Sequence, residues 1–274
     1  MAKVSEPHRH DPVTALSESA ATGRIAEIFA DIRDVMQLPL ITSVWRSLAG
    51  IEDGLESTWE AVRPIMLSGM PDRGLAELKQ ADQFLQPEQR FSGHSVSSDD
   101  VKSALAVMDA YNRSNTLNQF AITALVSGSK PGLPVGELGA SVEAWPKLPR
   151  LMEKDEIDPA TWSLLERVKF LGATNDSPVI ATLWRHLAHW PSLLTEILDV
   201  YEPLQADGSV DIAVHRNFGQ VAGLVDRMEV LDIDTSRIPA AALRMTAGYV
   251  NDPGAVNHMV TLGHSVRNWV AAAG

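Results

Sequence analysis

Apolar side chains recur at helical spacing along most of the chain. In the stretch that begins at Ile25 they fall at positions 25, 28, 29, 32, 35 and 36, which places them on one face of an α-helix. No segment alternates apolar and polar residues over the length of a strand. The pattern therefore predicts an all-α protein with roughly ten or more helices.

Several prolines stand where an apolar periodic stretch begins. A proline in the first turn of a helix costs nothing, because its missing N–H would have no partner there. Asp158 and Asp252 directly precede two of these prolines and are expected to cap the helices. Helices are therefore expected to open at Pro39, Pro159, Pro178, Pro191 and Pro253.

The chain also contains an internal repeat. Residues 38–64 align with residues 177–203 at a constant shift of 139 positions and without a gap. Eight of these 27 positions are identical, including the Trp-Arg pairs at 45–46 and 184–185. Self-similarity at a fixed offset is the signature of repeated structural units, so the sequence indicates two diverged copies of one helical module.

The predicted copies span residues 20–127 and 158–270, and residues 128–157 form the linker between them. The linker is rich in proline and glycine and cannot be a continuous helix. Two homologous copies in one chain imitate a homodimer with a pseudo-two-fold axis, and the cleft between them is the default place for a ligand. The sequence leaves open whether the chain also forms a homo-oligomer.

Charge and composition remove several classes of function. The chain has 35 acidic and 23 basic side chains, a formal charge of −12, and no Lys/Arg cluster that could follow a phosphate backbone, so no nucleic acid is expected as a partner. The N-terminus is polar, and no run of about 20 apolar residues occurs, so a cytoplasmic protein without a membrane association is expected. With no cysteine, disulfides and thiolate chemistry are excluded.

Two histidines raise the question of a metal. His186 and His189 lie three positions apart on a predicted helix, which is the minimum spacing for two metal ligands on one face. No carboxylate stands beside them, and the metalloprotease spacing is absent. We therefore expect no metal site, and the sequence contains no motif for a cofactor.

The polar segment Tyr-Asn-Arg-Ser-Asn at 111–115 is predicted to be a turn between two helices, because Asn and Ser are common in such turns. Two interpretations stay open. The polar side chains could cap the helix ends, or Tyr111, Asn112 and Asn115 could hold a ligand or a water.

The repeated arginines Arg46 and Arg185 also allow two interpretations. A guanidinium can bind a substrate carboxylate through two parallel hydrogen bonds. Alternatively, the arginines pair with Glu27 and Glu166, which repeat at the same shift, while the adjacent indoles fill the core. The second interpretation is favoured.

These motifs together resemble the group I 2-haloacid dehalogenases, the DehI-like family. The resemblance covers most of the chain and depends on the segment 39–49, on Tyr111-Asn-x-x-Asn115 with the following Ile122-Thr-Ala-Leu125, and on Leu187-Ala-x-Trp-Pro191. It implies an all-helical, internally duplicated protein with a long linker.

The resemblance also implies site residues. In that family an aspartate on a helix of the second copy activates a water that displaces halide from the α-carbon, and an asparagine helps to hold the water. The asparagine matches Asn115. The place of the aspartate is taken by Leu183 or, with a small gap, by Ala181, and the preceding serine of the family falls on Thr182.

Other family positions differ as well. Pocket aromatics of the first copy are replaced by Leu40 and Ser43. Asp176 is the nearest carboxylate that could substitute for the lost base, although a residue just before Pro178 is also suited to cap a helix.

The sequence thus predicts a dehalogenase-like enzyme that acts on a small organic substrate in the cleft between the copies. Because leucine cannot accept a proton, we expect hydrolytic or lyase/isomerase chemistry other than standard 2-haloacid dehalogenation. The alternatives are a catalytically silent small-molecule binding protein and a genuine 2-haloacid dehalogenase with Asp176 as base. The catalytic candidates are Asn115, Asp176 and Thr182, and the substrate-binding candidates are Leu40, Ser43, Arg46, Tyr111, Asn112, Leu183 and Arg185.

Overall fold

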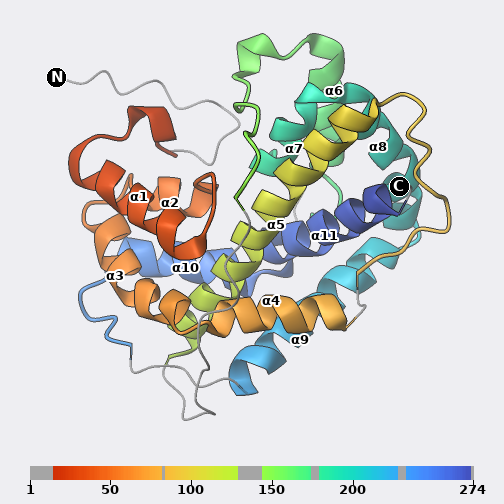
Figure 1. Cartoon of the computed structure of the whole chain (residues 1–274). Helices are drawn as coiled ribbons and strands as arrows, with labels where there is room; N and C mark the ends of the chain where they lie inside the picture. Colours follow the sequence, from red (N-terminus) through yellow and green to blue (C-terminus); the bar gives the residue numbers. More distant parts are fainter. Residues whose placement is uncertain (1–14, 82–83, 129–143, 174–178, 228–232, 273–274) are drawn as a thin grey trace.

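The computed structural model of the protein describes residues 15–81, 84–128, 144–173, 179–227 and 233–272. Within these ranges every regular element is a helix (Figure 1), so the predicted all-α class is confirmed. None of the described helices is both long and apolar enough to cross a membrane. In chain order the elements are η1 (Glu18–Ala20), α1 (Gly23–Met36), α2 (Ser43–Leu48), α3 (Gly54–Leu67), α4 (Met70–Gln80), α5 (Ser98–Ser127), η2 (Lys154–Glu156), α6 (Pro159–Val168), α7 (Thr182–His186), η3 (Leu187–His189), α8 (Pro191–Ala206), α9 (Ser209–Arg227), α10 (Ala240–Asn251), the π-helical η4 (Pro253–Asn257) and α11 (His258–Ala271).

Two of the predicted helix caps are confirmed. The Asp158 carboxylate accepts hydrogen bonds from the backbone N–H groups of Ala160 and Thr161 in the first turn of α6. Asp252 accepts one from Gly254 at the start of η4. A carboxylate at this place satisfies N–H groups that have no partner within the helix, which fixes where each helix begins.

The prediction that a helix begins at a proline was correct at Pro191, which opens α8, and wrong at Pro39. Helix α2 begins at Ser43, four residues after Pro39. The chain bends at 39 and 40 and stays non-helical up to Thr42, where the backbone N–H of Ile41 donates to Glu18, at 2.7 Å, and the Ile41 side chain is buried. Pro178 lies outside the described residues.

The predicted turn at 111–115 was also wrong, because α5 continues through it as a single helix of 30 residues. Two of its polar side chains, Arg113 and Ser114, find partners on neighbouring elements instead of ending the helix. Arg113 donates to the carbonyl of Met36 at 3.0 Å, and the Ser114 hydroxyl lies 3.0 Å from that of Thr42. Tertiary contacts have therefore overridden the turn preference of Asn and Ser.

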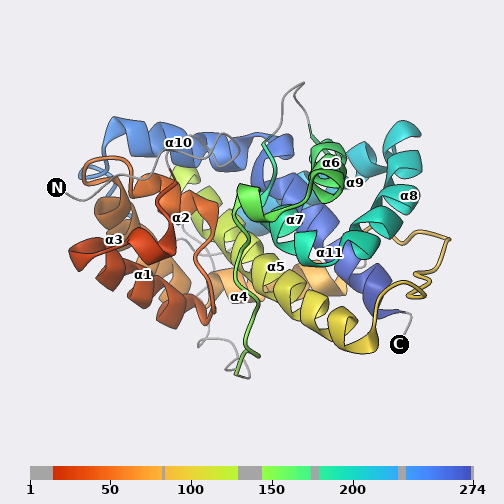
Figure 2. The same ribbon diagram turned by 90° about the horizontal axis from the view of Figure 1, so that it is seen from above.

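Helix α5 runs through two hydrophobic cores. Its N-terminal half, with Val107 and Met108, packs in one core with α6, α7 and α8. Its C-terminal half, with Leu117 and Phe120, packs in the other core with α1 to α4 and α10. Each core thus contains residues from both halves of the chain, and the polar stretch of α5 lies between the cores. Figures 1 and 2 show α5 crossing α11 in the middle of the molecule.

The described part of the linker, residues 144–157, contains no helix longer than the single turn η2, as predicted for this segment. It contacts both halves of the molecule. The Trp145 indole N–H donates to the carbonyl of Gln37 at 2.9 Å, and the carbonyl of Pro149 lies 2.7 Å from Nε2 of His186. The linker residues 129–143 lie outside the described residues.

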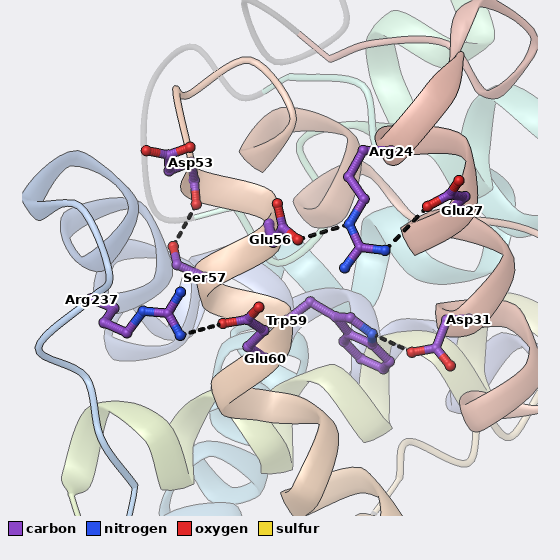
Figure 3. A network of polar contacts seen from close by, with 9 residues as sticks. All are labelled: Arg24, Glu27, Asp31, Asp53, Glu56, Ser57, Trp59, Glu60 and Arg237. Atoms are coloured by element: carbon purple, nitrogen blue, oxygen red, sulfur yellow. Dashed lines mark hydrogen bonds and ion pairs between the residues drawn. The ribbon is translucent and has the colours of Figure 1, made fainter.

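A network of ionic and polar contacts ties α3 to α1 and to the segment before α10 (Figure 3). Arg24 of α1 pairs with Glu56 of α3 at 2.7 Å, and Arg237 pairs with Glu60 at 3.0 Å. The Trp59 indole donates to Asp31 at 2.7 Å. The two ion pairs are largely solvent-exposed, so each adds little stability, and the buried faces of the helices supply most of it.

Helices α4 and α5 approach each other closely at Gly74. A Cβ atom at this position of α4 would lie 2.6 Å from the Phe120 ring of α5, which is fully buried. The ring has no room to move in a packed core, so only glycine allows α4 and α5 to come this close.

We predict that Gly74→Ala lowers the free energy of unfolding by about 1–3 kcal/mol, since overpacking a core displaces buried side chains. The measurement is urea unfolding of the purified variant. The control is Gly248→Ala on α10, where a Cβ would meet no atom within 4 Å. That variant should gain about 0.5–1 kcal/mol, because alanine is the better helix former. Equal effects of the two substitutions would contradict the close approach.

Candidate functional site

The polar stretch of α5 meets α7 and α11 at one place, which we call the seam and define by Asn112, Leu183 and Gly263. A Cβ on Gly263 would lie 2.1 Å from Oδ1 of Asn112 and 3.5 Å from a methyl group of Leu183. The absent side chain of Gly263 therefore makes room for the Asn112 amide. Two candidates from the sequence, one in each half of the chain, come together here.

The Asn112 amide is buried and lacks a hydrogen-bond partner. Its side chain is 2% exposed, and neither Oδ1 nor Nδ2 bonds to any described residue. An amide left in this state costs about 1–3 kcal/mol relative to one that is hydrogen-bonded. Because Asn112 can both donate and accept, the seam offers polar capacity that the described protein residues do not use.

Next to the seam, Tyr111 and His186 form a buried pair. The Tyr111 hydroxyl lies 3.3 Å from Nδ1 of His186, and Nε2 of the same ring lies 2.7 Å from the carbonyl of Pro149. A carbonyl only accepts, so Nε2 carries the proton and donates it, which leaves Nδ1 to accept from the tyrosine. Burial lowers the pKa of His186 to about 4, with only partial compensation by the bond to Pro149. The imidazole is therefore neutral near pH 7.

Both histidines of the pair have their Nε2 atoms against backbone carbonyls. Nε2 of His189 lies 2.8 Å from the carbonyl of Arg150, next to the carbonyl bound by His186. Both rings thus bind consecutive carbonyls of the linker. Across the described ranges, no group of three or more His, Asp or Glu side chains could hold a metal ion.

Both repeated Trp-Arg pairs are buried. Trp45 and Trp184 are at most 1% exposed, so the prediction that the indoles fill the core is confirmed. The expected pairing of Arg46 with Glu27 was wrong, and that of Arg185 with Glu166 stays a prediction. Glu27 pairs with Arg24, at 3.2 Å, and Glu166 pairs with Lys169, at 2.6 Å. On the helix surface these cations lie three positions away, within easy reach of each glutamate.

Arg46 and Arg185 are each 5% exposed and lie in the interior. They belong to α2 and α7, two short helices that also contain the candidates Ser43, Thr182 and Leu183. Ser43 and Thr182 are the first residues of these helices and are partly buried. Leu40 packs in the same core as Tyr111 and Leu183, so it lies on the seam side of the molecule.

Two catalytic candidates stay predictions. Asn115 is partly buried on α5 and makes no hydrogen bond to another described residue. Asp176 lies outside the described residues. The asparagine that lies at the seam is Asn112, one helical turn before Asn115.

A second asparagine on α5 shows the opposite state. Asn118 accepts from the Trp45 indole at 3.0 Å and donates to the Thr42 hydroxyl at 3.0 Å. The sequence analysis missed this residue, and its partners lie more than 70 positions away in the chain. The signal that could have found it is the helical period, since Asn118 stands three and four positions before the apolar Ala121 and Ile122 and so shares their face of α5.

The buried polar stretch extends along α5 and α11. The Thr116 hydroxyl lies 3.0 Å from Nε2 of His264, whose ring stacks on Phe84 with the centroids 4.7 Å apart. Burial lowers the pKa of His264, as do the charges of Lys79 and Arg267, to about 3. This histidine, also missed in the sequence, is another neutral base in the interior.

Several solved structures have a similar arrangement of helices. One is a complex of a D-2-haloacid dehalogenase mutant with D-2-CPA, with a TM-score of 0.75, 13% identity, and coverage of 98% of this chain and 99% of that one. The fold is that of the D-2-haloacid dehalogenases. A second similar structure, of a D-2-haloacid dehalogenase with L-LA, has a TM-score of 0.75, 12% identity and full coverage of both chains.

A third, of a D-2-haloacid dehalogenase mutant, has a TM-score of 0.73 and 13% identity over 96% of this chain and 98% of that one. No protein-family model and no curated protein sequence matches the chain. At this identity the likeness concerns the dehalogenase-like fold. The chemistry has to be argued from the side chains at the seam.

The lowered pKa of His186 predicts a pH dependence of stability. The folded state has a pKa of about 4 and the unfolded state one of 6.5, so between these values the unfolded state binds more protons. The free energy of unfolding should therefore fall as the pH falls from 6.5 to about 4, with His186 contributing up to about 1.4 kcal/mol per pH unit.

Urea unfolding of His186→Gln across this range should give a shallower dependence than the wild-type protein. Part of the slope remains, because His264 acts in the same direction. The control is His215→Gln on the exposed face of α9, which should follow the wild-type curve. Identical slopes for wild type and His186→Gln would show that His186 does not carry this dependence.

Proposed function

We propose that the chain is an enzyme that binds a small organic substrate at the seam of α5, α7 and α11. The reaction is hydrolytic or of the lyase/isomerase type and differs from standard 2-haloacid dehalogenation. The observation that carries this proposal is the buried, unpartnered amide of Asn112, in a fold shared with D-2-haloacid dehalogenases.

Asn112 suits a substrate that carries a carbonyl, carboxylate or hydroxyl group. The amide N–H donates to a substrate oxygen, and Oδ1 accepts from a hydroxyl or a water. In a low-dielectric site such a bond is stronger than in water, and it removes the cost of the unpartnered amide. Asn112 therefore has more to gain from a bound ligand than Asn118, whose bonds are already made.

The proton chemistry differs from that of the family that the sequence resembles. In that family an aspartate activates the attacking water, and its place here falls on Leu183 or Ala181. Leu183 is 1% exposed and cannot accept a proton. Loss of a general base typically costs about two to four orders of magnitude in rate.

His186 lies one turn after Leu183 on α7 and supplies a neutral imidazole. Its Nδ1 faces the Tyr111 hydroxyl, so a proton given up by a substrate or a water to the tyrosine oxygen can be balanced by transfer of the tyrosine proton to Nδ1. Tyr111 is then the group that meets the substrate, and His186 acts through it. A folded-state pKa of about 4 makes His186 a weak base, which suits a substrate whose proton is already acidified.

A small-molecule binding protein without catalysis is the second candidate. It is favoured by the burial of Leu183 in the core that α6, α7 and α8 form with the N-terminal half of α5. This places an apolar side chain beside the Asn112 amide. Such a site can hold a ligand but has no acid or base in contact with it. The two candidates differ in whether a bound compound is consumed, which mass spectrometry of the recovered ligand decides.

We also propose that the two halves arose by duplication. Helices α2 and α7 begin at Ser43 and Thr182, and α4 and α9 begin at Met70 and Ser209, so both pairs start 139 residues apart. This is the shift found in the sequence. The proposed repeats at 20–127 and 158–270 share both cores, so neither repeat has a hydrophobic core of its own.

The first test of the proposed chemistry uses halide release. We predict that the purified protein releases no chloride from either enantiomer of 2-chloropropionate, because Leu183 supplies no base. Leu183→Asp alone should not restore release, since Leu40 and Ser43 also replace pocket aromatics. Leu183→Asn is the control for the polar volume of the new side chain, and circular dichroism confirms that both variants fold. Chloride release by the wild-type protein that is abolished by Asp176→Asn would instead establish a dehalogenase with a relocated base.

The second test separates a functional from a structural asparagine. We predict that Asn112→Leu leaves the free energy of unfolding unchanged or raises it, because an unpartnered amide is replaced by an apolar group of the same shape. The same variant should lose binding of the small acids that the wild-type protein retains. Ligand-observed NMR with a panel of 2-hydroxy, 2-halo and 2-oxo acids measures the binding.

The matched control is Asn118→Leu on the same helix. It should lower the free energy of unfolding by about 1–3 kcal/mol, because it leaves the Trp45 indole N–H buried without an acceptor. Gly263→Ala is a second way to disturb the site, since its methyl group displaces the Asn112 amide. Strong destabilisation by Asn112→Leu would contradict the proposed role of the amide. Unchanged ligand binding in both Asn112→Leu and Gly263→Ala would contradict it as well.

A further inference from the structure

A pocket of about 340 Å³ lies between α4 and α9, away from the seam. Helices α4 and α9 are at the bottom of Figure 1, whereas α7 is near the top. The volume is at the lower end of the range of small-molecule sites, about 300–1,000 Å³. Neither the candidates from the sequence nor the seam residues line this pocket.

Missing side chains on α9 create the pocket. Gly219 and Gly223 line it and are one helical turn apart, so they share a face of the helix. A Cβ at Gly219 would meet no atom within 4 Å, and one at Gly223 would meet only the Arg227 guanidinium, at 3.6 Å. Space is therefore open at both glycines, and a side chain there would fill it.

The polar lining combines two acceptors with one cation. Oε1 of Gln220 is buried and has no hydrogen-bond partner among the described residues, and the Glu77 carboxylate stands on the facing helix α4. Arg227 closes the α9 side. Within the part of the chain that the structure describes, neither Glu77 nor Arg227 is engaged in an ion pair.

The remaining lining is apolar. Leu78 and Leu224, both buried, contribute it from the two helices. A ligand that matches all of these groups has an ammonium for Gln220 and Glu77, a carboxylate for Arg227, and a short apolar side chain for the leucines. We propose that this pocket is a second site, separate from the seam, that binds a small α-amino acid with an apolar side chain.

Calorimetric titration of the full-length protein with L-leucine tests the site. The expected result is saturable one-site binding. Two analogues check the charge complementarity, 4-methylpentanoate without the ammonium and 3-methylbutylamine without the carboxylate, and each should bind at least about tenfold more weakly. An analogue that binds as tightly as L-leucine would overturn the assignment to an amino acid.

Three variants locate the site. Gly219→Leu fills the pocket on a helix face that has room for the side chain and should abolish binding. Gln220→Leu and Arg227→Gln each remove one recognition group and should weaken binding by about tenfold or more. The control is Gly248→Leu on α10, at another helical glycine without a neighbour within 4 Å, and it should bind as the wild type does.

Absence of saturable binding to the wild-type protein would overturn the proposal. So would unchanged affinity in Gly219→Leu, because the ligand would then bind elsewhere. The seam variant Asn112→Leu should bind L-leucine normally. This outcome is independent of the proposed function, so the two proposals can fail separately.

Discussion

The structure depends on the passage of one long helix, α5, between two hydrophobic cores. Its apolar ends belong to different cores, and its polar middle lies where the cores meet. Two neighbours approach it closely at a glycine, Gly74 of α4 against Phe120 and Gly263 of α11 against Asn112. Packing against α5 thus fixes the positions of both α4 and α11. Because each core draws helices from both halves of the chain, the cores are expected to form together and to unfold as one cooperative unit.

Polar groups at the boundary between the cores have two different fates. The Asn118 amide is hydrogen-bonded to Trp45 and to Thr42, and these bonds hold α2 against α5. Asn112, less than two turns away, has the same side chain and equal burial but no partner among the described residues. Since buried amides are normally satisfied, this contrast within one helix is what separates a structural asparagine from a candidate for ligand binding. The proposal for the seam is founded on that difference more than on the likeness of fold.

The sequence was sufficient for the parts of the structure that depend on local pattern. Apolar periodicity predicted the helical class, and the carboxylate before Pro159 predicted the start of α6, because both signals act within a few residues. It failed where distant partners decide. The segment 111–115 has the composition of a turn, yet Ser114 bonds to Thr42 and Arg113 to Met36, so the helix continues. The pairing of Tyr111 with His186 joins residues 75 positions apart, and no spacing rule could have found it.

The proposed duplication explains why the two halves resemble each other in helix placement but not in chemistry. Trp45 and Trp184 are buried alike, yet only the Trp45 indole has an acceptor, Asn118, while Nε1 of Trp184 has none among the described residues. Shape is maintained by apolar packing, which tolerates many sequences of similar volume, whereas a hydrogen bond needs a specific partner. Two copies can therefore diverge in their polar groups while their helices stay in register. Such divergence leaves a satisfied polar cluster around Asn118. At the boundary with the second half it leaves Asn112, without a partner among the described residues, and the Tyr111–His186 pair, and this is where we propose that the substrate binds.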